Sequence, residues 1–236
     1  MTGPYVTAII PVYNDCEALQ RAIVCSLSEL EKITDTFELI IAEDASTDGS
    51  TELVQEWAQK DQRIVLMHRN VRLGRGSALT AVSQKARGDI ICYYDVDLAT
   101  DMHFLPGLIK AIEDGCDMAT GSRLLPESSI IRSDNREVKS RGYNLLVRIL
   151  LRSRIKDHQC GFKAFNREKL CALLPFVRDG YWFWDTEVLV RGQRAGYRIC
   201  EMPVIWREGP GTTVTSHDVW KMGRAIVSLW WNLHVS

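Results

Sequence analysis

Residues 89–97 read DIICYYDVD, an apolar run that ends on two aspartates. An uninterrupted apolar run of this length is typical of a strand that is buried on both faces of a sheet. Three further short strands precede it, and segments with helical periodicity separate them. The expected strands cover residues 5–10, 37–42, 63–68 and 89–94, and the expected helices cover residues 16–30, 50–59 and 77–86. This alternation predicts an α/β fold, a mostly parallel sheet with helices on both faces.

The second half of the chain is less regular. Further helices are expected at residues 104–113, 143–151, 185–195 and 217–235, and further strands at residues 117–120 and 198–206. The polar stretch 124–139 is interpreted as a mobile loop over the site, and Pro11 is expected to end the first strand. Without a repeat or linker, we expect one catalytic domain over residues 1–214, followed by an amphipathic C-terminal helix over residues 215–236.

The composition fits a globular chain and excludes several classes of protein. The chain has 236 residues, of which 46% are hydrophobic and 25% charged, with a formal net charge of −1. This rules out wholesale disorder and leaves no global basic field for binding nucleic acid. No apolar run reaches the roughly 18–20 residues that span a bilayer, and the N-terminus lacks a signal-peptide layout. The seven cysteines form an odd set without a CxxC pair, so we expect unpaired core thiols and a reducing, cytoplasmic location.

Polar side chains follow each of the first four expected strands. They are Tyr13, Asn14 and Asp15 after the first, Glu43, Asp44, Ser46 and Asp48 after the second, Asn70 and residues 74–76 after the third, and Asp95 and Asp97 after the fourth. In parallel α/β sheets, ligands bind outside the carboxyl ends of the strands. The sequence therefore predicts one binding site at this edge.

Two of these groups suggest a chemistry. Asp95 and Asp97 can reach one hard cation that bridges to a diphosphate, although the same spacing also fits two solvated loop aspartates. Asp44 can accept a hydrogen bond from a uracil or guanine ring, and the following EDASTDGS segment (residues 43–50) also fits a plain helix cap. Neither GxGxxG nor GxxxxGK[ST] occurs, which disfavours a dinucleotide-binding dehydrogenase and a P-loop NTPase.

Two basic or amphipathic segments have several possible uses. Residues 132–156 contain eight Lys and Arg against one Asp and one Glu, which suits an anionic membrane, a phosphate acceptor or a solvated face. The expected C-terminal helix carries Trp220, Trp230 and Trp231 beside Lys221 and Arg224. This pattern suits a membrane interface, a dimer contact or docking on the protein's own core.

Taken in order, the motifs resemble those of family 2 glycosyltransferases of the GT-A fold, and more closely the polyprenyl-phosphate (dolichyl-phosphate) sugar synthases. PVYND at residues 11–15 is similar to P-x-Y-N-E, EDASTDGS to D-D-x-S-x-D-G-T, and DVD at residues 95–97 is the D-x-D motif. REVKSRG at residues 136–142 resembles the acceptor-loop pattern R-x-x-x-S-[RK]-G, and DHQCGFK at residues 157–163 resembles D-x-Q-C-G-F-K of the dolichyl-phosphate glucose branch. Asn70, Gly74 and Gly76, then GSR, WDTE and EMPV at residues 121–123, 184–187 and 201–204, complete the series.

The resemblance implies a role for particular residues. The nucleotide sugar would be held by Pro11, Tyr13, Asp15, Asp44, Asp95, Val96, Asp97 and Arg207. Mg²⁺ or Mn²⁺ would be bound by Asp95 and Asp97, and the acceptor phosphate by Arg123, Arg136 and Ser140. The catalytic group would then comprise Asp97, Arg123, Arg136 and Ser140.

The implied reaction is inverting, metal-dependent transfer of a hexose from a nucleotide sugar to a polyprenyl or dolichyl phosphate. The QCGFK form favours a UDP-sugar, while GDP-mannose remains open. The implied location is peripheral, on the cytoplasmic face of a membrane. Three departures from the family pattern stand out: Ala99 in place of a glutamine that helps to hold the metal, Thr213 in place of a lysine in GTTV (residues 211–214), and the lack of transmembrane helices.

Two alternatives remain open at this point. A family 2 transferase acting on a saccharide hydroxyl would need a general base, and the nearest candidates, Asp185 and Glu187, do not form the usual adjacent pair. A non-catalytic nucleotide-sugar-binding subunit that recruits a membrane partner would also fit the departures at Ala99 and Thr213. Asp157 and Glu187 suit either the orientation of sugar hydroxyls and arginines or structural salt bridges.

Overall fold

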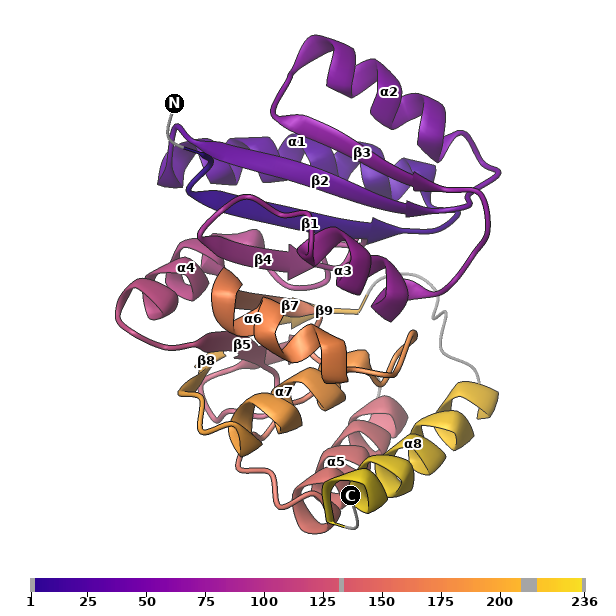
Figure 1. Ribbon diagram of the computed structural model, residues 1–236, viewed down its shortest axis with the longest axis vertical. Coiled ribbons are helices and arrows are strands. Elements are labelled where there is room, and N and C mark those ends of the chain that lie inside the picture. The colour runs from indigo at the N-terminus through magenta and orange to yellow at the C-terminus, as the bar shows by residue number, and fades with distance from the viewer. Residues whose placement is uncertain (1–2, 132–133, 209–215, 235–236) are drawn as a thin grey trace.

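The computed structural model describes residues 3–131, 134–208 and 216–234, and its centre is a seven-stranded sheet between two layers of helices (Figure 1). The strand order is β3-β2-β1-β4-β7-β5-β8. These strands are β1 (Val6–Val12), β2 (Phe37–Asp44), β3 (Ile64–Arg69), β4 (Ile90–Tyr94), β5 (Met118–Ser122), β7 (Phe162–Asn166) and β8 (Ile199–Pro203). A separate parallel pair consists of β6 (Ser129–Ile131) and β9 (Ile205–Arg207). The predicted mostly parallel α/β sheet is confirmed, because only β7 runs antiparallel to its neighbours β4 and β5.

Helices cover both faces of the sheet. They are α1 (Cys16–Ile33), α2 (Ser50–Lys60), α3 (Arg75–Ser83), α4 (Leu105–Glu113), α5 (Asp134–Leu150), α6 (Arg167–Leu173), α7 (Trp184–Arg194) and α8 (Ser216–His234), with short 3-10 turns at Met102–Phe104 and Leu174–Phe176. One apolar core joins α1, α2 and α4 to the sheet, and a second joins α3, α6 and α7 to the opposite face. Alternate residues of β1 divide between the two cores: Ala8 and Ile10 enter the first, and Ile9 enters the second. This alternation fixes the register of the central strand.

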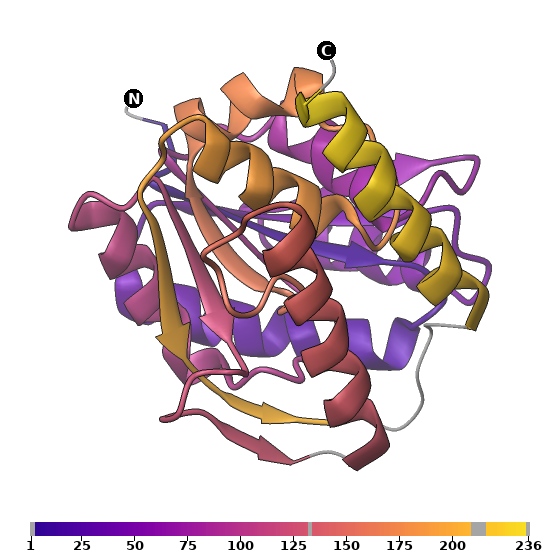
Figure 2. The ribbon, with the colours of Figure 1, turned by 90° about the horizontal axis from the view of Figure 1, so that it is seen from below.

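A third, smaller core holds α5 and α8 together on α7. Val147 of α5, Val190 of α7 and Ile226 of α8 are fully buried within it. Figure 2 shows α5 and α8 running side by side along one flank of the molecule. The apolar face of the C-terminal helix is thus used for docking on the protein's own core, one of the three uses that its sequence left open. The expected domain boundary at residue 214 falls within residues 209–215, which lie outside the described part of the chain.

Two sequence expectations for the backbone are wrong. The expected loop over residues 124–139 contains β6 and the start of α5, because β6 finds its partner in β9, more than 70 residues later in the chain. Pro11 does not end the first strand, which continues to Val12. β1 pairs with β4 only as far as Ile9, whereas it pairs with β2 through Val12. At Pro11 one edge of the strand therefore has no paired strand, and a proline, which has no N–H group to donate, is tolerated at such an edge.

The sequence reading also missed β7 and α6. β7 reads FKAFN, and a lysine within so short an apolar run obscures the strand pattern. The strand nevertheless inserts between β4 and β5, and Lys163 pairs with Tyr93 on one side and with Thr120 on the other. Lys163 is fully buried there. The single antiparallel strand therefore places a cation in the middle of the sheet.

Two cysteines are paired, contrary to the expectation of unpaired thiols. A disulfide joins Cys116, which precedes β5, to Cys200 in the edge strand β8. The two residues are 84 positions apart, so spacing in the sequence gives no sign of their proximity. The bond closes a long loop and thereby stabilises the attachment of the edge strand by restricting the unfolded chain. The other five cysteines are free.

Candidate active site

The loops after β1 and β2 are joined to each other at the predicted edge of the sheet. The backbone N–H of Asn14 donates to Ser46 Oγ at 3.0 Å, and Asn14 Oδ1 accepts from the N–H of Thr47 at 2.8 Å. Asp48 Oδ2 accepts from the N–H of Cys16 at 2.8 Å. Asp15 caps α1, its Oδ1 accepting from the N–H of Ala18. These bonds hold the two strand ends as one surface, with Pro11 buried beneath it in β1.

Asp44 connects this surface to the loop after β3. Its carboxylate accepts from the backbone N–H groups of Leu73 at 3.0 Å and Gly74 at 2.7 Å, and it is almost fully buried. In the same loop, the Arg72 guanidinium lies 3.7 Å from the centroid of the Tyr13 ring. The structure thus brings Tyr13 and Asp44, both predicted nucleotide ligands, into contact with consecutive residues of one short loop.

A buried glutamate stiffens the strand end beside Asp44. Glu43 is inaccessible to solvent and accepts hydrogen bonds from the N–H of Ser46, from Thr51 Oγ1 at 3.1 Å and from His68 Nδ1. These donors hold the pKa of Glu43 below its usual value against the opposing effect of burial. The hydrogen bond to Glu43 raises the pKa of His68. Glu43 is therefore ionised and orients the turn that begins at Ser46.

His68 gives this strand end a pH dependence with a definite sign. Because its pKa is raised in the folded protein, protonated His68 stabilises the fold below about pH 6.5, its unfolded value, and this contribution is lost as pH rises through the folded value. We expect His68→Gln to cost more unfolding free energy at about pH 5.5 than at about pH 9. Urea unfolding of both proteins at the two pH values measures the difference. An equal cost at both would show that the Glu43 contact does not involve protonated His68.

Asp95 and Asp97 follow β4 and line a pocket at the same edge. Its walls are formed by Tyr94, Asp95, Asp97, Leu98, Ala99, Thr100, Gly161 and Trp206. Burial, and then the charge of Asp95, raise the pKa of Asp97, whose carboxylate also accepts from the N–H of Ala99 at 3.1 Å. Val96, between the two aspartates, packs on the first core. The pair therefore presents an excess of negative charge toward the pocket.

Arg75 fixes the orientation of Asp95. Its Nε and Nη2 donate to Asp95 Oδ1 at 2.8 and 2.7 Å, and its Nη1 donates to Asp185 Oδ2 at 2.7 Å. The other oxygen, Asp95 Oδ2, lies against Gly161, where an added Cβ would come within 1.7 Å of it. A side chain at position 161 would collide with the Asp95 carboxylate in the orientation that Arg75 sets. Glycine at this position therefore leaves room for that orientation.

Lys163 completes this buried network. Its Nζ donates to Asp185 Oδ1 at 2.8 Å, to Tyr93 Oη at 3.2 Å and to the carbonyl oxygen of Cys160. Burial lowers the pKa of Lys163 to about 7, and the nearby Arg75 guanidinium lowers it further; burial raises the pKa of Asp185, and the same guanidinium opposes that rise. The series Lys163–Asp185–Arg75–Asp95 connects the antiparallel strand to the D-x-D carboxylate.

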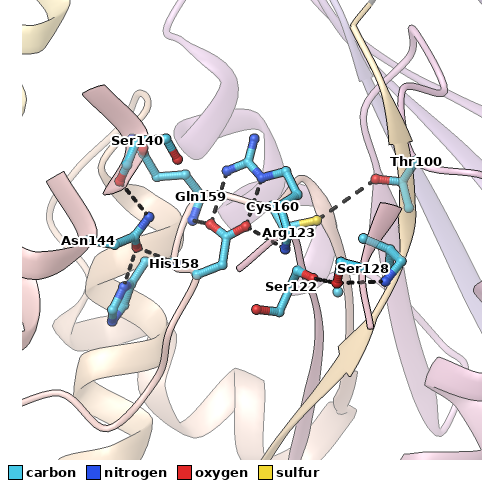
Figure 3. A network of polar contacts seen from close by, with 12 residues as sticks. Thr100, Ser122, Arg123, Ser128, Ser140, Asn144, His158, Gln159 and Cys160 are labelled. Carbon is cyan, nitrogen blue, oxygen red and sulfur yellow. Dashed lines mark hydrogen bonds and ion pairs between the residues drawn. The ribbon is translucent and has the colours of Figure 1, made fainter. Parts of the chain in front are cut away.

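Arg123, one of the predicted acceptor residues, directly follows β5 and is paired with Asp157. Asp157 Oδ2 accepts from Arg123 Nε at 2.7 Å, and Asp157 Oδ1 accepts from its Nη2 at 3.0 Å (Figure 3). Burial alone would raise the pKa of Asp157, but the Arg123 guanidinium holds it far below its usual value. The guanidinium also lies 5.5 Å from the ring centroid of Trp206, a wall of the pocket that contains Asp95 and Asp97. Arg123, the predicted acceptor arginine, and the D-x-D pocket are therefore neighbours.

The remaining predicted residues differ in how much of their surroundings the structure describes. The Ser140 hydroxyl, in α5, is buried and has no hydrogen-bond partner among the described residues. Arg207 lies in β9, and its backbone N–H donates to the carbonyl of Ala99 at 2.8 Å, which puts it beside the pocket. Arg136 is in α5, but its side chain, like the whole of Thr213, lies outside the described part of the chain.

The two candidate general bases have structural partners. Asp185 is held by Arg75 and Lys163, as described above. Glu187 accepts from the N–H groups of Arg178 and Asp179, both at 2.9 Å, and pairs with Arg191 at 2.8 Å. Both carboxylates are buried and committed to ion pairs or backbone donors. Neither is placed as a free proton acceptor.

The sequence places Arg75 at the predicted site edge, within residues 74–76, and Lys163 within the segment DHQCGFK, but these two motifs give no sign of the role of either side chain. Their partners lie far away in the chain, with Arg75 and Asp185 separated by 110 positions. A signal was nevertheless present, because a lysine flanked by Phe162 and Ala164 in an apolar segment requires a buried partner.

Comparison with known proteins identifies the family of this chain. The family model described as "Glycosyl transferase family 2" matches residues 7–174, which include Asp95, Asp97, Arg123 and the Arg75 loop. The chain belongs to glycosyl transferase family 2. The resemblance stated from the motifs is thereby confirmed.

Family 2 relatives cover almost the whole chain. Glycosyltransferase AglD from Haloferax volcanii is 45% identical over 237 residues, which is 99% of this chain but 38% of that protein. The chain thus spans well under half the length of this relative. Dolichyl-phosphate beta-glucosyltransferase ALG5D from Trichomonas vaginalis is 31% identical over 92% of this chain and 70% of that protein.

Solved structures of low sequence identity share the fold. Glucosyl-3-phosphoglycerate synthase from Mycobacterium tuberculosis, in complex with UDP, matches with a TM-score of 0.68 at 19% identity, covering 98% of this chain and 80% of that one. A mannosyltransferase from Pyrobaculum calidifontis, in complex with GDP-mannose and Mn²⁺, matches with a TM-score of 0.63 at 22% identity, over 99% and 64% of the two chains. The family 2 chain has the GT-A-like fold that its motifs indicate.

Proposed function

We propose that this protein transfers a hexose, with inversion, from a nucleotide sugar to a polyprenyl or dolichyl phosphate. The main observation in support of this proposal is the position of Arg123, whose buried guanidinium is fixed by Asp157 beside the Asp95–Asp97 pocket. The unpartnered Ser140 hydroxyl supports an anionic acceptor, because a buried hydroxyl without a partner is costly unless a ligand completes it. The similarity to a dolichyl-phosphate beta-glucosyltransferase supports the choice of lipid.

The donor would bind across the ends of β1, β2 and β4. Tyr13 and Asp44 would contact the base, and Asp15 and the turn at Ser46 would contact the nucleoside. Arg75 holds Asp95 in one orientation before the donor arrives, so the carboxylate needs little reorganisation on binding. We favour a UDP-sugar from the QCGFK segment and keep a GDP-sugar as the second choice.

The carboxylates of Asp95 and Asp97 fit a hard divalent cation, Mg²⁺ or Mn²⁺. Burial and mutual repulsion raise the pKa of Asp97, and a cation would relieve this unfavourable charge. Within the described residues no group of three or more His, Cys, Asp or Glu side chains gathers as a complete metal site. Two carboxylates with diphosphate and water oxygens suit such a cation, which when bound would neutralise charge on the leaving diphosphate.

A phosphate acceptor is consistent with the commitment of the two candidate bases, Asp185 and Glu187, to ion pairs. A phosphate monoester is mostly ionised near neutral pH, since its second pKa is about 6, and it can attack the anomeric carbon without losing a proton to the protein. Arg123 would align this anion opposite the departing nucleotide, and Ser140 would donate to one of its oxygens. A saccharide hydroxyl would need a base, whereas Asp185 and Glu187 are held in ion pairs. The structure therefore favours a phosphate over a hydroxyl acceptor.

A peripheral contact with the membrane would bring the protein to such a lipid. The outer faces of α5 and α8 expose large apolar side chains, with Ile149 at 65% and Trp231 at 60% of their full accessibility. Arg148 and Arg224 lie among them. This combination of apolar and basic side chains suits an anionic interface. No helix in the described ranges has the length and apolar character needed to cross a bilayer.

The decisive experiment measures transfer of radiolabelled sugar into the organic phase. UDP-glucose and GDP-mannose would each be supplied with dolichyl phosphate, undecaprenyl phosphate or a free saccharide, with Mn²⁺ or with EDTA. We expect label in the lipid phosphate fraction, lost on addition of EDTA. Label in the saccharide alone would overturn the phosphate-acceptor proposal, and nucleotide binding without transfer to either kind of acceptor would favour a non-catalytic nucleotide-sugar-binding subunit.

A further inference from the structure

Three consecutive side chains connect the Arg123 site to two different helices. Asp157 forms an ion pair with Arg123. His158, the next residue in the chain, contacts Asn144 of α5, and Gln159 Nε2 donates to Met222 Sδ of α8 at 3.3 Å. Figure 3 shows the first two of these contacts lying side by side. Asp157 and His158, adjacent in the chain, therefore link Arg123 to α5, the helix that carries Ser140, through an ion pair and a hydrogen bond.

The contacts of His158 determine its tautomer. Asn144 Nδ2 donates to the carbonyl oxygen of Ser140 at 3.0 Å, so Asn144 Oδ1 is the acceptor that faces the histidine. It receives the backbone N–H of His158 at 2.9 Å and the Nδ1–H of its ring at 2.8 Å. Nε2 then accepts from the Ser153 hydroxyl at 2.8 Å. Burial lowers the pKa of His158 to about 3, which keeps the ring neutral and this pattern intact at physiological pH.

The same contacts anchor the turn of α5 on which Ser140 lies. The carbonyl oxygen of Ser140 accepts from Asn144 Nδ2, while the buried Ser140 hydroxyl has no partner within the described residues. Arg123 and Ser140 come from different elements, β5 and α5, and neither element alone sets the distance between them. Asp157 fixes Arg123, and the adjacent His158 fixes the turn that carries Ser140 through Asn144.

We infer that His158 is a positioning residue for the acceptor: as a neutral hydrogen-bond donor to Asn144, it keeps Ser140 at a fixed place relative to Arg123. This inference rests on the proposed function, in which both groups contact the acceptor phosphate. Its consequence is selective. Loss of the His158–Asn144 bond displaces the α5 turn without touching Asp44, Asp95 or Asp97, so acceptor binding weakens while donor binding does not.

Two substitutions separate the hydrogen bond from simple packing. His158→Leu removes the donor, whereas His158→Asn retains an N–H group near the position of Nδ1. With dolichyl phosphate as acceptor, we expect His158→Leu to raise the acceptor KM about tenfold, with the donor KM within about twofold of wild type, and His158→Asn to stay within about threefold in both. His103→Leu, at an exposed histidine far from this contact, is the matched control.

Several results would overturn the inference. They are an unchanged acceptor KM in His158→Leu, an equal rise in the donor KM, or equal impairment of His158→Asn and His158→Leu. If His158→Leu does not fold, Asn144→Ala takes its place, since it removes the acceptor of the same hydrogen bond; an acceptor KM raised about threefold with an unchanged donor KM supports the inference, and an unchanged acceptor KM contradicts it.

A measurement without turnover separates this inference from the proposed function. Amide hydrogen exchange across residues 140–150 of α5 should be about tenfold faster in His158→Leu and unchanged in His158→Asn. If wild-type protein transfers no sugar to a lipid phosphate but exchange changes in this way, the proposed acceptor is wrong while His158 still positions α5. If exchange in α5 is unchanged in His158→Leu, the positioning role itself is wrong.

Discussion

Asp97→Asn is expected to lower the rate of sugar transfer about 10³-fold, because an amide cannot replace the charge that steadies a diphosphate in the transition state. Asp97 is the less constrained of the two D-x-D carboxylates, since Arg75 holds Asp95 but not Asp97. Its raised pKa shows that the ionised form is disfavoured in the free protein. The substitution therefore removes the repulsion between Asp97 and Asp95 at the same time as it removes activity. We expect the free energy of unfolding of Asp97→Asn to equal or slightly exceed that of the wild type.

The measurement pairs initial rates with binding of Mn²⁺ in the presence of UDP or GDP. Asp114→Asn is the matched control, because the Asp114 side chain is exposed just beyond the C-terminus of α4 and forms an ion pair with the exposed Lys110. It should retain full activity. If Asp97→Asn transfers sugar at a rate near wild type, the D-x-D pair does not support catalysis, and a cation-independent reaction would have to be considered.

Arg75→Met is expected to reduce the free energy of unfolding by about 3–5 kcal/mol, the usual cost of removing one partner from a buried ion pair. Arg75 bridges two carboxylates, and Asp185 is 4% exposed, so its charge keeps only Lys163 as a partner. Asp95 would also lose the two bonds that fix its orientation, so we expect the donor KM to rise as well. Urea unfolding and donor kinetics on the same preparation test both effects.

A double substitution shows that the cost arises from the orphaned charge. Asp185→Asn added to Arg75→Met removes the carboxylate that has lost its partner, so the pair of changes should destabilise less than the sum of the two alone. Arg72→Met is the control in the same loop, since Arg72 is exposed and its stacking on Tyr13 is worth less than about 1 kcal/mol. A loss in Arg75→Met no larger than in Arg72→Met would contradict a structural role for the bridge.

Features that depend on neighbouring residues could be predicted from the sequence. Apolar runs such as residues 89–94 identified the central strands because a strand buried on both faces requires them. The placement of Asp44, Asp95 and Asp97 at one edge followed from the parallel order of those strands alone. The predictions failed where pairing depends on distant segments, as for β6 with β9 and for the disulfide between Cys116 and Cys200.

The sequence by itself determined the class of fold, the edge at which the site lies and the carboxylates that face it. Strand periodicity and the alternation of strands with helices along the chain are local properties of the sequence. Only the tertiary structure decided how those groups are held. Arg75 meets Asp185 across 110 positions, and Lys163 meets both Asp185 and Tyr93, because β7 enters the sheet antiparallel between β4 and β5. A buried charge takes its partner from whatever packing brings within reach, and local sequence carries no record of that choice.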